Sequence, residues 1–126
     1  MKKFITTSVL FVAFAVAAMA QTQSDLFKMT TEADADVVLK VLSTELKLST
    51  EEFSKVREIL VKSAQSQAQS LQDKNLNTPE MQVNVLRRQT LHIETNLKTI
   101  LGEEKFKAYE AAKTKLTEQV KGNRKN

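Results

Sequence analysis

Glycine and proline, the residues that let a chain turn sharply, are almost missing from this sequence. Among 126 residues, only Gly102, Gly122 and Pro79 are of these two types. A sheet of short strands therefore has almost nowhere to reverse direction, because tight β-turns depend on such residues. Cysteine is absent as well, so disulfides and thiolate metal sites cannot stabilise the fold. The sequence predicts an all-α protein stabilised by helix packing or by oligomerisation.

The first 20 residues have the pattern of a secretory signal peptide. Lys2 and Lys3 precede a mostly apolar stretch over residues 4–17, and the small residues of Ala18-Met19-Ala20 flank a cleavage site. This stretch is shorter than the ~20 residues that span a bilayer, so cleavage is favoured over a retained membrane anchor. We expect residues 1–20 to be removed and Gln21 to begin the mature protein.

The mature chain is small and nearly neutral. It has 106 residues, enough for one domain and too few for two. Two of the 19 basic residues leave with the leader, so 17 remain against 15 acidic residues, a net charge of +2. This charge is too small for strong binding to nucleic-acid phosphates. We expect no nucleic-acid partner and no stable membrane insertion after cleavage.

Apolar residues recur at helical spacing in four segments, which are separated by capping residues. We predict helices over residues 31–46, 50–74, 79–101 and 103–120, preceded by a flexible lead-in at 21–30 and followed by a frayed basic tail at 121–126. A four-helix domain or helical hairpin results, and its small size favours a dimer.

The second predicted helix has a strong and a weak half. Its buried stripe consists of Phe53, Val56, Leu60, Ala64, Gln67 and Leu71. Residues 63–70 are dominated by serine, glutamine and alanine, which make a slim, polar helix. We interpret this half as a solvated extension; the alternative is a low-relief surface over which another chain lies.

A short pattern occurs twice in the chain, 53 residues apart. Residues 48–53, Leu-Ser-Thr-Glu-Glu-Phe, align with residues 101–106, Leu-Gly-Glu-Glu-Lys-Phe. Both copies have the form of a helix start. In the first, Ser49 and Glu52 have the spacing of a capping box, whereas in the second Gly102 takes the capping position.

This repeat resembles the LTxxQ repeats of the Spy/CpxP family of small helical periplasmic proteins. The resemblance covers roughly residues 31–120, and the motif positions are Leu48, Ser49, Glu52, Leu101, Gly102 and Lys105. It implies an antiparallel, cradle-shaped homodimer in the periplasm that holds unfolded envelope proteins without ATP. The alternative within the family is an envelope-stress regulator that binds one specific periplasmic partner, such as a sensor domain.

The helix predicted at 79–101 has two partly apolar faces. Its main stripe consists of Val83, Leu86, Thr90, Ile93, Leu97 and Ile100. At ~100° per residue, Met81, Val85 and His92 lie nearly opposite this stripe, with Arg88 beside them. In a lone hairpin one face stays exposed, so it forms either a subunit interface, which we favour, or a client-binding surface. The candidate residues of this surface are Met81, Val85, Arg87 and Arg88.

The residues that enzymes use are not grouped into a recognisable motif. His92 is the only histidine, and neither a nucleophile elbow nor a glycine-rich phosphate loop is present. The acidic pairs at Glu51 and Glu103 begin predicted helices, where the helix dipole explains them. Met29 and Met81 are the only thioethers after the leader, a poor basis for copper binding. We expect no enzyme activity, no cofactor and no metal.

Overall fold

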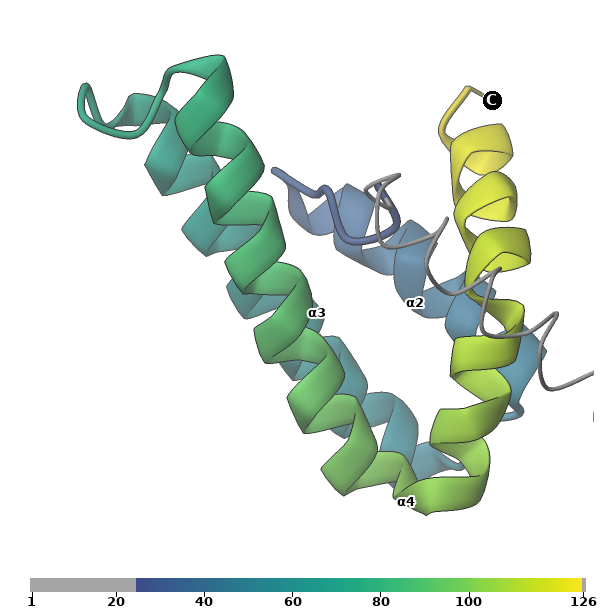
Figure 1. Cartoon of the computed structure of the whole chain (residues 1–126). Helices are drawn as coiled ribbons and strands as arrows, with labels where there is room; N and C mark the ends of the chain where they lie inside the picture. The colour runs from purple at the N-terminus through teal and green to yellow at the C-terminus, as the bar shows by residue number, and fades with distance from the viewer. Residues whose placement is uncertain (1–24, 126) are drawn as a thin grey trace, which may run out of the picture.

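The computed structural model describes residues 25–125, so the predicted leader at residues 1–20 lies outside the described part. The described residues form three helices and no strand: α2 (Glu32–Leu46), α3 (Thr50–Gln72) and α4 (Pro79–Lys125) (Figure 1). The all-α prediction is confirmed. Three helices stand where four were predicted, because the last two segments join into α4.

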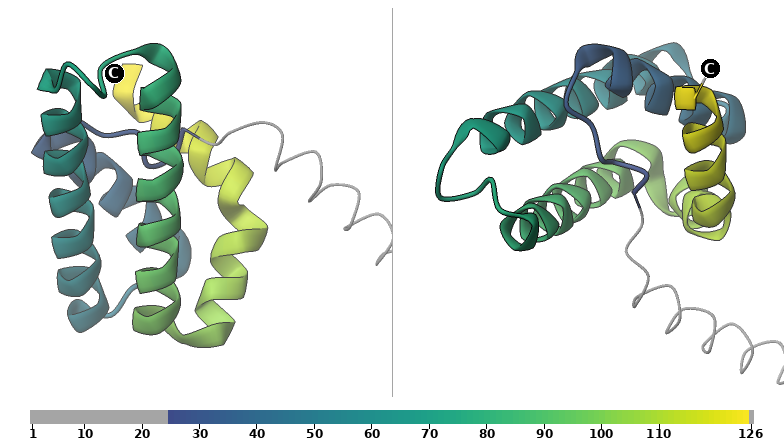
Figure 2. Two further views of the ribbon diagram at one scale, coloured as in Figure 1. Left: turned by 60° about the vertical axis from the view of Figure 1, so that its left-hand side comes forward. Right: turned by 90° about the horizontal axis from the view of Figure 1, so that it is seen from above.

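Helix α4 bends sharply at Gly102. This residue has φ 84° and ψ 170°, a region that only glycine enters without strain. The bend divides α4 into a first arm, residues 79–101, and a second arm, residues 103–125. The first arm forms an antiparallel hairpin with α3, and the second arm turns back beside α2 (Figures 1 and 2). The glycine of the second repeat therefore sets the shape of the molecule.

Local capping explains where the helices begin. The Thr31 hydroxyl accepts the Asp34 N–H at 3.0 Å, and at Ser49 the full capping box is formed, with distances of 3.2 Å and 2.9 Å. At the start of α4, the Thr78 hydroxyl accepts the Met81 N–H at 3.2 Å, directly before Pro79. Such caps satisfy amide groups that have no partner within the helix.

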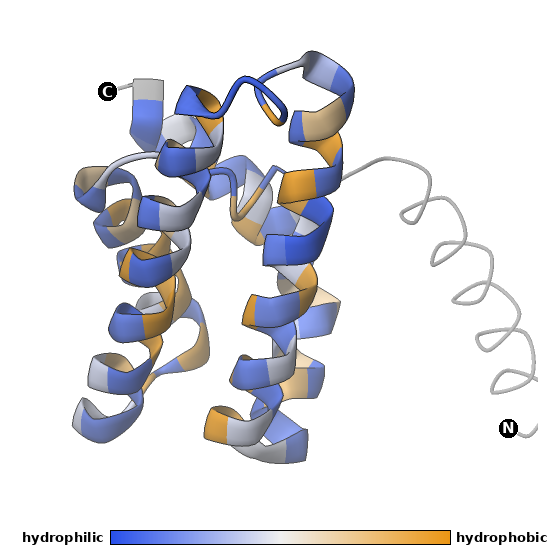
Figure 3. Cartoon of the chain, turned by 90° about the vertical axis from the view of Figure 1, so that its left-hand side faces the viewer, coloured by the Kyte–Doolittle hydropathy of each residue, from blue (hydrophilic) through white to orange (hydrophobic). Residues whose placement is uncertain are grey.

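One apolar core lies between the three helices, each of which contacts the other two. Figure 3 shows that the outward helix faces are largely hydrophilic. The largest fully buried side chains are Leu26, Phe27, Met29, Val38, Leu42, Val56, Leu60, Ile93, Leu97, Tyr109, Leu116 and Val120. Among residues 25–125, no helix combines the length and the apolar character needed to cross a membrane.

Both predicted flexible ends differ from expectation where the structure describes them. In the lead-in, Leu26, Phe27 and Met29 are completely buried, because they fill the space between the helices. At the other end, α4 continues to Lys125, and the Arg124 guanidinium lies 3.9 Å from the Asp34 carboxylate. Residues 121–125 are therefore helical and not a frayed tail.

Candidate functional site

The two copies of the repeat meet in space. The Lys105 ammonium donates to the Glu52 carboxylate at 2.6 Å and to the Lys47 carbonyl at 3.3 Å. Glu52 and Lys105 occupy equivalent positions of the two copies, and the contact joins the start of α3 to the start of the second arm of α4. Lys47 is the left-handed cap that ends α2, so this contact also fixes the α2–α3 turn.

Electrostatics at this junction favour the charged carboxylate. The hydrogen bond from Lys105, followed by that from the Ser49 backbone, lowers the pKa of Glu52. Leu48 packs against the core, and Leu101 is buried within it. All the motif positions therefore have a structural role: they cap helices, set the bend at Gly102 or hold the two helix starts together.

The structure brings only two of the four candidate surface residues into one hollow. Val85 and Arg88 line a hollow of about 280 Å³ between α3 and the first arm of α4, although Val85 itself is only 8 % exposed. Met81 is half-buried and Arg87 is exposed, and neither lines this hollow. Val83, predicted to be buried, is 46 % exposed.

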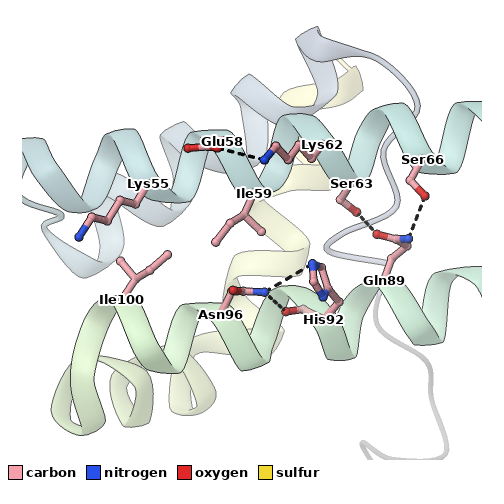
Figure 4. Close-up of a pocket in the computed structure, with 10 residues that line it drawn as sticks. All are labelled: Lys55, Glu58, Ile59, Lys62, Ser63, Ser66, Gln89, His92, Asn96 and Ile100. Carbon is pink, nitrogen blue, oxygen red and sulfur yellow. Dashed lines mark hydrogen bonds and ion pairs between the residues drawn. The ribbon is translucent and has the colours of Figure 1, made fainter.

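A larger groove runs along the outer face of the same hairpin. It measures about 530 Å³ and shares Ser66 and Gln89 with the smaller hollow. Figure 4 shows Ile59 and Ile100 facing each other at one end, with polar side chains along the remainder. The full lining is Lys55, Glu58, Ile59, Lys62, Ser63, Ser66, Gln89, His92, Asn96 and Ile100. We call this surface the outer groove.

His92 lies in the outer groove. Its backbone carbonyl accepts the Asn96 amide N–H at 2.8 Å, and its ring Nε2 is 3.5 Å from the same Asn96 nitrogen (Figure 4). Within residues 25–125, no three His, Cys, Asp or Glu side chains are grouped closely enough to hold a metal ion.

One face of the polar half of α3 is buried, which contradicts its interpretation as a solvated extension past the core. Ser63, Gln67 and Ser70 are at most 6 % exposed. Their polar atoms are satisfied by neighbours, as buried groups must be. The Ser63 hydroxyl donates to Gln89 Oε1 at 2.8 Å, and the Gln67 amide donates to Ser63 Oγ at 3.1 Å. A chain of hydrogen bonds thus passes through the hairpin from the outer groove to the core.

Gln67 ends this chain by holding the segment before α2. Its Nε2 donates to the Phe27 carbonyl at 2.7 Å, and its Oε1 accepts the Met29 N–H at 3.1 Å. We call residues 25–30 the strap and the space that they fill the trough. Seen from above, the strap crosses between the α3 side of the molecule and the arms of α4 (Figure 2).

A second, partly buried polar cluster joins the two arms of α4. The Tyr109 hydroxyl donates to Glu94 Oε2 at 2.6 Å, and the Lys113 ammonium donates to the same oxygen at 2.7 Å. The Tyr109 ring is fully buried between Phe27, at 6.2 Å, and Phe106, at 5.5 Å. Burial, and then the charge of Glu94, raise the pKa of Tyr109 well above its usual range. The phenol therefore remains a protonated donor, which suits a structural role.

Sequence reasoning placed Gln67 on a buried stripe but missed its partners. Helical spacing also aligns Tyr109 with Phe106, Leu116 and Val120 on one face of its helix. The helical period put both residues on inward faces. Their partners lie far along the chain, 38 and 40 residues away for Gln67 and 15 residues away for Tyr109. A glutamine on an apolar stripe could have indicated a distant hydrogen-bond partner, because the amide of a buried glutamine needs one.

No protein-family model, no curated protein and no solved structure matches this chain.

Proposed function

We propose that this chain is a periplasmic, ATP-independent chaperone-like protein that binds unfolded or misfolded envelope proteins. The sequence supports this function through its secretory leader and its resemblance to the Spy/CpxP repeats. The fold supports it through an all-α frame with mixed surface charge and several exposed apolar side chains.

One observation carries the proposal. Val83 and Leu91 are 46 % and 65 % exposed, and Arg87 lies between them with an exposed side chain. Residues four apart lie on the same helix face, so these three form a single stripe on the first arm of α4. Exposed apolar groups beside a cation suit weak capture of unfolded chains. We call Val83, Arg87 and Leu91 the exposed stripe.

We also propose an antiparallel homodimer that joins the α3–α4 hairpins of two copies through their outer grooves. At ~100° per residue, His92 and Asn96 of the outer groove lie on roughly the opposite side of α4 from the exposed stripe. The two surfaces are therefore separate, and a dimer formed through the groove leaves the stripe free. Sedimentation of the secreted protein with and without Ile59→Lys tests this interface, and an unchanged mass for the variant would contradict it.

The chaperone proposal is tested by suppression of aggregation. The full chain is expressed with its own leader, purified from the periplasm and added without ATP to two unrelated, chemically unfolded proteins. Light scattering is followed at increasing ratios. We expect suppression with both clients, and Leu91→Ser should raise the ratio needed for half-suppression about fivefold, because roughly 1 kcal/mol of apolar contact is lost.

Leu71→Ser is the matched control. Leu71 is also an exposed leucine on a helix, at 46 %, but it belongs to α3. This variant should suppress aggregation as well as the unchanged protein does. If neither client is protected at excess by a protein whose helical circular dichroism is intact, the chaperone proposal fails.

The second candidate function is envelope-stress regulation through one specific partner, such as a sensor domain. The outer groove favours this alternative, because the Gln89 and Asn96 side chains are held in place by hydrogen bonds (Figure 4). Preorganised polar groups fit one complementary surface better than many. Saturable binding to a single envelope protein, abolished by Gln89→Ala, would support it.

A further inference from the structure

We propose that the trough occupied by the strap is an exchangeable binding site for a short apolar segment of an unfolded protein, an inference that rests on the proposed function. The bound segment takes the form of a turn, as in the strap, where the Lys28 N–H donates to the Asp25 carbonyl at 3.1 Å. The occupant that it fits has three apolar side chains in the spacing of Leu26, Phe27 and Met29. The chain's own strap covers the site until a client segment replaces it.

The trough selects by shape and not by charge. Leu26, Phe27 and Met29 are fully buried, whereas Lys28 between them is exposed. Phe27 lies against the ring of Tyr109, with ring centroids 6.2 Å apart, and belongs to the same apolar cluster as Leu42 of α2. The site thus accepts two adjacent large apolar residues, an unrestricted third and an apolar fourth.

Recognition of the backbone makes the site tolerant of sequence. Gln67 is 4 % exposed, and its amide contacts strap atoms that every peptide has: the carbonyl of one residue and the N–H of the residue two further on. Its remaining donor capacity is used by Ser63. A buried amide preorganised in this way binds any segment that adopts the turn of the strap and has the apolar spacing described above.

The strap can leave without unwinding a helix. Residues 25–30 are not part of a helix, and their connection to α2 passes through Thr30, whose N–H donates to Asp34 at 3.0 Å. A client segment competes with a tethered strap, so its apparent affinity is low. Weak binding is what a protein that must later release its clients requires.

A client segment fits the trough better than the strap of a second copy. Only Thr30 separates Met29 from Thr31, the capping residue of α2, and this two-residue step spans at most about 7 Å. A second copy could therefore insert its strap only if its α2 also lay against the trough. A segment of an unfolded chain has no such restriction.

Fluorescence anisotropy with a labelled peptide tests the proposal. The peptide has the sequence of residues 25–31, and the control peptide carries serine at the three apolar positions. The receptors are the secreted protein and its Phe27→Ala variant, in which the strap loses its largest anchor. We expect the variant to bind the peptide at least about tenfold more tightly than the unchanged protein, since the competing strap is weakened. Adding Gln67→Ala to the variant should weaken binding about tenfold.

The matched control replaces another buried-face glutamine. Gln82 donates to Ser70 Oγ and to the Leu76 carbonyl, away from the strap, so Gln82→Ala in the same background should leave peptide binding unchanged. Equal affinity for the unchanged protein and the Phe27→Ala variant, or equal affinity for both peptides, would overturn the proposal. Assembly by strap exchange, seen as a mass of the Phe27→Ala variant twice that of the unchanged protein and not reduced by the peptide, would overturn it as well.

Hydrogen exchange on the unchanged protein provides a measurement that does not depend on the folding of any variant. Saturating peptide should make the Met29 amide exchange its hydrogen with solvent, while the amides of α3 and α4 stay protected. Continued protection of the Met29 amide would refute replacement of the strap by the peptide. The results for the trough can be told apart from the results for the chaperone proposal. Peptide binding without suppression of aggregation supports the trough alone, whereas suppression that needs Leu91 but not Gln67 contradicts the trough alone.

Discussion

Replacing Tyr109 with phenylalanine should destabilise the fold by a predictable amount. The change keeps the buried ring and removes only the hydroxyl that donates to Glu94 at 2.6 Å. A hydrogen bond to a charged group contributes about 1.5–3 kcal/mol. Glu94 is 22 % exposed and keeps its contact with Lys113, so the lower end applies. We expect a loss of about 1.5 kcal/mol at neutral pH, or roughly 6 °C in Tm.

The same substitution should change how stability depends on pH. The pKa of Tyr109 is raised in the folded protein, so its contribution is fully present below the ordinary value of 10.0 and is lost as pH rises above it. Above that value the free energy of unfolding of the unchanged protein falls by about 1.4 kcal/mol per pH unit relative to that of Tyr109→Phe, which has no phenol hydroxyl to ionise. The two stability curves should therefore cross near about pH 11.

Urea denaturation followed by far-ultraviolet circular dichroism, at several pH values, measures both effects. Combining Tyr109→Phe with Glu94→Gln in a double-mutant cycle isolates the contribution of the pair. A variant within about 0.5 kcal/mol of the unchanged protein at neutral pH, or a constant difference up to about pH 12, would refute the assigned role of the hydroxyl.

Two further predictions concern the repeat. The pKa of Glu52 is lowered in the folded protein, so its contribution to stability is present above the ordinary value of 4.5 and is lost as pH falls below it. Glu52→Gln should therefore reduce the loss of stability in acid by up to about 1 kcal/mol. A variant with the same acid sensitivity as the unchanged protein would be inconsistent with the contact to Lys105. Gly102→Ala should cost about 1–3 kcal/mol through backbone strain alone, because nothing lies within 4 Å of an added Cβ. Gly122→Ala, in a helical and equally open position, should instead stabilise by up to about 1 kcal/mol; chemical denaturation compares the two, and equal effects would argue against strain at the bend.

The parts of the fold that the sequence predicted correctly depend on local interactions. The starts at Thr31, Ser49 and Pro79 follow from side chains that bond to amides three residues away. The break at Gly102 follows from a residue that alone tolerates its backbone angles. Such signals need no knowledge of the rest of the chain, which is why they could be read in advance.

The parts that were missed depend on contacts between distant residues. The lead-in looked flexible because its three apolar residues show no helical period, yet the space between the helices accommodates them. Helical periodicity placed Phe53 and Leu71 on the buried stripe, but they are 38 % and 46 % exposed. The core does not extend to the two ends of α3 on that side, and no single-helix pattern contains this information.

The hydrogen bonds inside the hairpin also restrict how its two helices can align. If α3 slid by one turn along the first arm of α4, the buried Ser63 hydroxyl would lose Gln89 and the buried Ser70 hydroxyl would lose Gln82. Each buried polar group left without a partner costs about 1–3 kcal/mol, whereas apolar side chains tolerate such a slip more readily. Serine and glutamine therefore fix the register of the two helices. A version of α3 with an all-leucine stripe would bind apolar surfaces more strongly, but it would be free to pair in several alignments.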